Sequence, residues 1–131
     1  MSLPRATEYQ IHCAIVELLE LRLPEGCLVH HSPNEGNHRV QYRTKQKKMG
    51  MRPGWPDLEI FVPRYYWKQA DIWAPIFLEV KRPKGRVTNA QARVHKYLKS
   101  IGCHVFVVHG VDEVSEIIDK GWWQWSCPLR V

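Results

Sequence analysis

Two short segments that have the pattern of neighbouring strands place the strongest constraint on this chain. Residues 57–62 and 76–81 each carry an alternating arrangement of side chains, and Glu79 follows Asp57 by 22 residues. Because successive side chains of a strand point to opposite faces, Glu79 and Lys81 share one face. The sequence therefore predicts a sheet in which two carboxylates and one amine meet at one place.

The length and composition indicate one folded domain. The chain has 131 residues, 44% of them hydrophobic, which is enough for a single core, and we expect one domain over residues 1–131. A formal charge of +6 and a pI of about 9.3 favour polyanionic partners such as nucleic acid, although a basic protein without such a partner has the same charge.

The sequence lacks the motifs that indicate several other classes of function. The four cysteines form no CxxC pair, so a zinc site is not expected. The seven histidines have no convincing metal-ligand spacing, although His12 lies one turn after Glu8. The sequence has no Walker-type phosphate loop, no signal peptide and no membrane span, and the expected location is the cytoplasm.

A first helix is predicted over residues 7–23. Thr7 and Gln10 form the pattern of a capping box. The apolar stripe of this helix consists of Ile11, Ile15 and Leu18, with Leu19 beside it. Glu8 extends the stripe by one turn, so we expect its carboxylate to face the interior, although first-turn acids also suit the helix dipole.

The remaining segments predict an α/β layered domain with a mixed sheet. Thr88 and Gln91 form a second capping box, and the helix that follows ends at Gly102. Its expected apolar face consists of Ala90, Val94, Tyr97, Leu98 and Ile101. Further elements are expected as strands at 27–31 and 104–109, a short helix ending at Gly50, and a helix at 112–118. The Trp-rich tail, 122–131, is either an edge strand or a packing segment.

A stretch without acidic residues runs from Asn37 to Arg52. Such a stretch is either a solvated face or a surface for a phosphate backbone, and its position just before Pro56 and Asp57 favours the second. The candidate DNA contacts are Arg39, Arg43, Lys45, Lys47, Lys48 and Arg52, together with Lys84 and Arg86.

The carboxylates suit phosphodiester hydrolysis. A hard cation such as Mg²⁺ prefers oxygen ligands and can activate water and neutralise a phosphate. Asp57 and Glu79 are the natural ligands, the Val80 carbonyl is a third, and Glu8 completes the acidic cluster. Lys81 is then placed to orient the water or stabilise negative charge. An E-x-K pattern alone is common as an ordinary ion pair, but the preceding Pro-Asp at this spacing favours an active site.

The motifs together are more specific than any one of them. They comprise Asn34-Glu35-Gly36, Met49-Gly50-Met51-Arg52-Pro53-Gly54-Trp55-Pro56-Asp57, Phe77-Leu78-Glu79-Val80-Lys81-Arg82, Gly85-Arg86-Val87-Thr88, Gln91, Leu98 and Gly102. In this order they resemble the VRR-NUC nucleases of the PD-(D/E)xK superfamily, over residues from about 7 to 118. Trp55 departs from the pattern, because small aliphatic residues are more usual before Pro-Asp in that family.

The resemblance implies a restriction-endonuclease-like fold, a central mixed sheet flanked by helices. It implies that Asp57, Glu79 and Lys81 form the catalytic core, that Glu8 is the acid of the first helix, and that Gln91 is an additional helix residue at the site. It further implies an endonuclease that uses Mg²⁺ or Mn²⁺ to cut DNA. Small stand-alone members resemble phage or bacterial proteins, tend to form homodimers and are associated with branched DNA, including four-way (Holliday) junctions.

Other functions remain open at this point. A nonspecific or flap-directed nuclease of the same fold, a module that binds DNA structures without cutting them, and a structural dimerisation protein all fit part of the pattern. The aromatic loop 63–75 favours a dimer interface or a satellite core over base stacking. Gln91 also has a purely structural interpretation as the third residue of a capping box.

Overall fold

The computed structural model describes residues 4–32, 40–67 and 69–120. Its centre is a four-stranded sheet in the order β1-β2-β3-β4. The strands are β1 (Leu28–His31), β2 (Leu58–Phe61), β3 (Ile76–Val80) and β4 (His104–Val108). β2 runs antiparallel to both β1 and β3, whereas β3 and β4 are parallel. The predicted mixed sheet is therefore confirmed, with each strand one or two residues shorter than expected.

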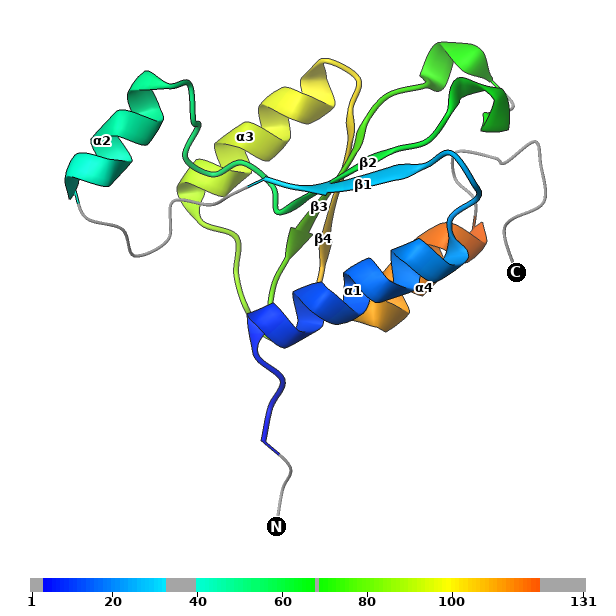
Figure 1. The fold of residues 1–131 in the computed structure, drawn as a ribbon, viewed down its shortest axis with the longest axis horizontal. Coiled ribbons are helices and arrows are strands. Elements are labelled where there is room, and N and C mark those ends of the chain that lie inside the picture. Colours follow the sequence, from blue (N-terminus) through cyan, green and yellow to red (C-terminus); the bar gives the residue numbers. More distant parts are fainter. Residues whose placement is uncertain (1–3, 33–39, 68, 121–131) are drawn as a thin grey trace.

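Helices lie on both faces of this sheet. The longer ones are α1 (Glu8–Arg22), α2 (Val40–Lys48), α3 (Asn89–Ser100) and α4 (Val111–Lys120). Helices α1 and α4 pack together on one face, α3 covers the other, and α2 stands to one side (Figure 1). None of the described helices has the length and apolar character needed to cross a bilayer.

Alternation along β3 divides the core into two parts. Leu78 and Val80 belong to the large cluster beneath α1 and α4, whereas Phe77 packs with Leu98 in a smaller cluster beneath α3. Glu79 shares the face of Phe77 because side chains two apart on a strand point the same way. The acid is thus directed into the layer between the sheet and α3.

The first helix begins where it was predicted, but its buried face differs by one residue from the predicted face. The capping box of Thr7 and Gln10 is present. The buried stripe runs through Leu19 while Leu18 is only half-buried, so the expected stripe was misplaced by one residue. Glu8 is exposed, which corrects the expectation that its side chain faces the interior.

The face of α3 also differs from the prediction. Its capping box is present, but Tyr97 and Ile101 are 61% and 58% exposed. His95 and Leu98 are the buried residues of this helix. The apolar pattern was misleading because the inward face carries polar side chains, and these shifted the apparent stripe towards Tyr97 and Ile101.

The aromatic loop after β2 forms two short 3-10 turns, at Arg64–Tyr66 and Ala70–Ile72. Tyr66 and Trp67 are buried in the main core cluster, so this part of the loop belongs to the main core and not to a satellite core. The indole of Trp67 donates to the Val62 carbonyl at 3.2 Å. The motif at residues 34–36, Arg39 and the Trp-rich tail lie outside the described residues.

Candidate active site

Asp57 and Glu79 come together at the ends of β2 and β3. Both are almost fully buried, with 3% and 1% of their surfaces exposed. The backbone N–H of Val80 donates to Oδ2 of Asp57 at 2.7 Å, which fixes this carboxylate against the end of β3. The two acids predicted to meet are therefore held together by the strand pairing and by this hydrogen bond.

Two side chains of α3 contact the Glu79 carboxyl group. Nε2 of His95 lies 2.9 Å from Oε1, and the side-chain amide of Gln91 donates to Oε2 at 3.4 Å. Burial, then a hydrogen bond that the protonated Glu79 carboxyl group donates to Asp57, then the charge of Asp57 raise the pKa of Glu79 to about 9. Glu79 is therefore protonated at neutral pH when no cation offsets the neighbouring carboxylate.

Lys81 completes the group on the same face of the chain. It is buried, with 9% of its surface exposed, and its backbone N–H donates to the Val108 carbonyl at 2.9 Å. Its charge opposes the rise in the pKa of Glu79 and helps to lower that of His95, whose main cause is burial, followed by Lys99. The ammonium group thus acts on the carboxyl group two residues before it.

The donor set fits a hard divalent cation. Two adjacent carboxyl groups, one of them with a strongly raised pKa, form a site whose electrostatic conflict a cation would relieve. The N–H and C=O of one strand residue point to the same edge, so the Val80 carbonyl faces the edge at which Asp57 lies. Asp57, Glu79 and the Val80 carbonyl are therefore the groups that would hold the ion.

Glu8 occupies a more distant position. It lies in the first turn of α1, and its charge raises the pKa of Glu79 only as the weakest of the causes. In the described part of the chain, no three or more His, Cys, Asp or Glu side chains form a group that could hold a metal ion. A ligand role for Glu8 stays a prediction.

Two histidines lie beside Asp57 on the side of α1. Nδ1 of His31 is 2.9 Å from the Asp57 carbonyl oxygen, and its ring meets that of His12 edge-on at 4.8 Å. The pKa of His12 is lowered, chiefly by burial and then by His31, against the opposing effects of Asp57 and Glu8. The sequence-based suggestion that His12 lies near the site agrees with this placement.

Gly54 allows the loop before Asp57 to approach α3 closely. Its φ of +86° suits glycine, and a Cβ there would lie 2.6 Å from the carbonyl carbon and oxygen of Ala90 and 2.8 Å from the Gln91 nitrogen. The Pro-Asp loop therefore rests directly on the first turn of the helix that supplies Gln91. This contact sets the position of Asp57 relative to α3.

Gln91 serves the cap and the site together. Its Oε1 accepts from the Thr88 backbone N–H at 2.9 Å while its Nε2 faces Glu79. The structural and active-site interpretations of this residue are thus compatible.

The candidate DNA contacts among the described residues are exposed and lie on two segments. Arg43, Lys45, Lys47 and Lys48 lie on α2, Arg52 follows it, and Lys84 and Arg86 lie in the turn between β3 and α3. In Figure 1, α2 and the first turns of α1 and α3 lie at the same side of the molecule. The candidate DNA contacts therefore come from two separate segments of the chain.

Two groups of side chains near the site were not predicted from the sequence. His95 stands four residues after Gln91, a spacing that places both on one helix face, and this was the available signal. Glu59 accepts from the Trp55 indole at 3.1 Å and from the Ser32 hydroxyl. The second cluster depends on the pairing of β1 with β2, which no local pattern contains.

The comparisons with known proteins now identify the family. The VRR-NUC domain model matches residues 5–112. The chain belongs to the VRR-NUC domain family. Membership in this nuclease family supports a nuclease that acts on DNA, and the resemblance inferred from the motifs is confirmed.

Solved structures agree with the VRR-NUC assignment. A structure titled "VRR_NUC domain" is 26% identical with a TM-score of 0.59, covering 89% of this chain and 100% of the other. A "VRR_NUC domain protein" is 24% identical with a TM-score of 0.69, covering 90% and 89%, and shows the shared fold. The predicted restriction-endonuclease-like fold class is confirmed. None of the curated proteins compared with the chain matches it.

Proposed function

We propose that this VRR-NUC protein is a metal-dependent DNA endonuclease that selects branched DNA, such as four-way junctions, and acts as a homodimer. The observation that carries the catalytic part is the buried pair of Asp57 and Glu79 with Lys81 on the same face. A protein that only binds DNA has no need to bury two carboxyl groups against each other at a cost in stability.

Asp57, Glu79 and the Val80 carbonyl are proposed to hold Mg²⁺ or Mn²⁺. When bound, such an ion neutralises phosphate charge and lowers the pKa of a water molecule. Glu79 must release its proton to become a ligand, so metal binding is coupled to proton release. His95 and Gln91 keep the ionised carboxylate oriented, because both groups remain able to donate to it.

Lys81 is proposed to act on the reacting phosphate. Its ammonium group lies in a largely buried environment, where a fixed charge stabilises a developing negative charge more strongly than it does in water. The same group can orient the attacking water by hydrogen bonding. The cations of α2 and of the turn with Lys84 and Arg86 would bind the flanking phosphates.

Selectivity for branched DNA rests on symmetry and on the family resemblance. A two-fold dimer presents two equivalent sites, which matches the two strands that must be cut to resolve a four-way junction. A cytoplasmic location, in a bacterial or phage-infected cell, belongs to the same proposal.

The experiment compares cleavage of a labelled four-way junction, flap, single strand and linear duplex with Mg²⁺, Mn²⁺ or EDTA. Wild type is tested beside Glu79→Gln, which nearly preserves the side-chain shape but cannot ionise. We expect metal-dependent paired nicks on the junction, little cutting of duplex, and no cutting by the variant. Cross-linking or light scattering reports whether the active species is a dimer.

The other outcomes identify the alternatives. Equal cutting of all substrates would favour a nonspecific nuclease, and preferential cutting of the flap would favour a flap-directed one. Tight junction binding without cleavage at any metal concentration would overturn the nuclease proposal in favour of a binding module. A monomer that cuts junctions would contradict the homodimer part of the proposal.

A further inference from the structure

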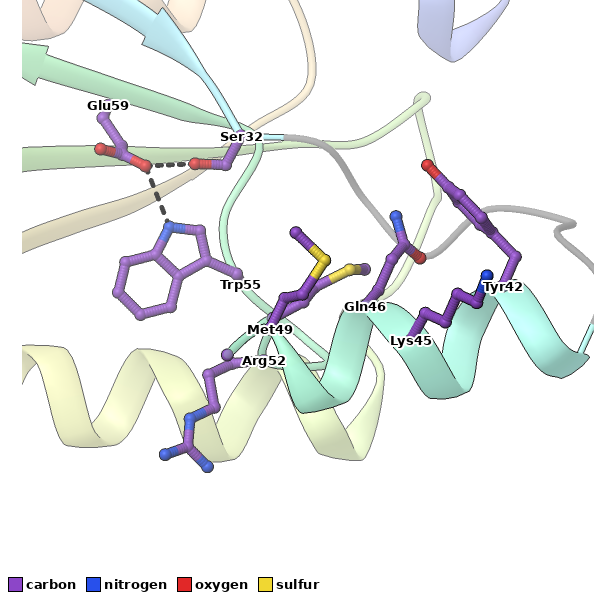
Figure 2. Close-up of a pocket in the computed structure, with 10 residues that line it drawn as sticks. Ser32, Tyr42, Lys45, Gln46, Met49, Arg52, Trp55 and Glu59 are labelled. Atoms are coloured by element: carbon purple, nitrogen blue, oxygen red, sulfur yellow. Dashed lines mark hydrogen bonds between the residues drawn. The ribbon is translucent and has the colours of Figure 1, made fainter.

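A hollow lies between α2 and the strands on the far side of the Pro-Asp loop. Its volume is about 600 Å³, within the range of roughly 300–1,000 Å³ that is usual for small-molecule pockets. Figure 2 shows Gln46 on α2, Met49 just after this helix, and Trp55 across from them, with its indole nitrogen directed at Glu59. None of these side chains belongs to the carboxyl pair described above.

The walls of the hollow include aromatic and thioether side chains. Trp55 is half-buried, its edge set against Phe77 at a ring separation of 5.5 Å and its N–H donating to Glu59 at 3.1 Å. The indole is thus locked by two contacts while it still lines the hollow. Tyr42 on α2 and Met49 in the turn after it, 50% and 86% exposed, add apolar surface. Planar, uncharged groups are well accommodated by such walls.

One residue that lines the hollow has a buried side-chain atom without a hydrogen-bond partner. The Oε1 atom of Gln46 is shielded from solvent and is the one such unsatisfied side-chain atom found in the described residues. A buried acceptor without a hydrogen bond costs about 1–3 kcal/mol, so its presence calls for an explanation such as a ligand. Because this oxygen is shielded from the open hollow, a ligand N–H group would pair with it once the Gln46 side chain turns towards the hollow.

The rim of the hollow is positively charged. Lys45 and Arg52 line it and are exposed, and α2 contains no acidic residue. A negatively charged linkage attached to a planar group complements this rim. A second α2 helix from another copy of the chain does not, because two cationic helices would repel each other.

We infer that the hollow binds one unpaired nucleobase of the DNA substrate, with its flanking phosphates on Lys45 and Arg52. The inference rests on the proposed function, since it names how that substrate is recognised. Trp55 stands two residues before Asp57, so the hollow adjoins the carboxyl pair along the chain. Branched and splayed DNA offers bases that are unstacked or easily unstacked, whereas intact duplex requires extrusion.

The test measures binding, in EDTA, to a splayed duplex in which each position of the unpaired arm is made abasic in turn. Wild type should lose about tenfold in affinity at one position near the branch, which lies within the range for stacking of a base on an aromatic side chain. Gln46→Leu, a substitution of similar volume at a half-buried helix position, should shrink that ratio. The matched control Lys45→Ala should weaken binding to the base-bearing and abasic DNA equally.

The outcomes separate this inference from the nuclease proposal. If no abasic position changes affinity by more than twofold, or if Gln46→Leu keeps the full ratio, the base site is wrong even when Glu79 proves essential for cleavage. If wild type cuts no DNA but the abasic effect and its loss in Gln46→Leu are present, the base site stands and the nuclease proposal fails. Quenching of a 2-aminopurine placed at the sensitive position reports the stacking directly.

Discussion

The Nε2 atom of His95 lies 2.9 Å from Oε1 of Glu79, although the two residues stand 16 positions apart and on different elements. Both side chains are buried, at 7% and 1% exposed. In the tautomer with hydrogen on Nε2, the imidazole donates to the carboxyl group and fixes its orientation. His95 is thus a positioning residue for the proposed metal ligand.

Replacing His95 tests this relationship. We expect His95→Ala to weaken Mn²⁺ binding by about 10–100-fold, as removal of the partner of a metal-ligating group usually does. His95→Gln should recover part of this loss, because its amide can still donate to Glu79. Calorimetric Mn²⁺ titration gives the affinity, and circular dichroism controls for folding. Unchanged Mn²⁺ affinity in a folded His95→Ala protein would leave the histidine with a packing role only.

Removal of the Lys81 side chain should affect the rate of cleavage and not the affinity for metal or DNA. Lys81→Ala is expected to retain Mn²⁺ and DNA affinity within a few-fold while cleaving about 10²–10³-fold more slowly, since it removes a charge that acts mainly on the transition state. Lys84→Ala, in the adjacent turn, should instead weaken DNA binding and reduce its salt dependence. Single-turnover cleavage at saturating protein distinguishes the two, and wild-type cleavage by Lys81→Ala would exclude it from the chemistry.

The stability of the metal-free protein should fall as pH rises. The pKa of Glu79 rises from 4.5 to about 9 on folding, so the native state binds more protons than the unfolded state between these values. The lowered pKa values of His12 and His95 act in the opposite direction, but only below the ordinary histidine value of 6.5. Between pH 7 and 8.5, Glu79 therefore dominates, with a slope of up to about 1 kcal/mol per pH unit.

Urea unfolding in EDTA at several pH values measures this slope. Burial of Glu79 is the main cause of the shift behind this slope, followed by Asp57, with Lys81 opposing it and Glu8 adding least, and His95 contacts the same carboxyl group. Glu79→Gln should flatten the profile, and Mg²⁺ should stabilise wild type more at pH 8.5 than at pH 7. A wild-type slope equal to that of Glu79→Gln would show that the carboxyl group ionises normally in the folded protein.

Gly54 provides a steric prediction with a built-in control. Gly54→Ala puts a Cβ against the α3 backbone and should destabilise the protein by about 1–3 kcal/mol beyond the strain of its positive φ. Gly102→Ala, at φ +100°, meets no atom within 4 Å and carries the strain alone. Thermal unfolding of both variants isolates the contact, and equal losses would mean that the loop can move away from the helix.

Local patterns predicted those features that local physics determines. The alternation of β3 placed Glu79 and Lys81 on one face, and the two capping boxes located the first turns of α1 and α3. The buried face of α3 was misjudged because it presents Gln91 and His95 inward, where an apolar pattern expects hydrophobic residues.

Features that depend on pairing between distant segments were harder to predict. His30 stands opposite Glu59 in the register of β1 and β2, and that register also brings Ser32 to the same carboxylate. The hollow beside Trp55 forms only because α2 is placed across from the sheet. Burial of Glu8 was expected from helix periodicity, but the helix begins beyond the edge of the core, so its first turn remains in solvent.

The double bonding of Gln91 limits how this protein can change. One end of the side-chain amide holds the first turn of a helix and the other end holds a carboxyl group that we propose to bind metal. Glutamate would cap the helix equally well but would repel Glu79, and asparagine is one methylene shorter. Two unrelated requirements therefore restrict this position to a single amino acid. A variant selected for a stronger helix start would lose the hydrogen bond to Glu79.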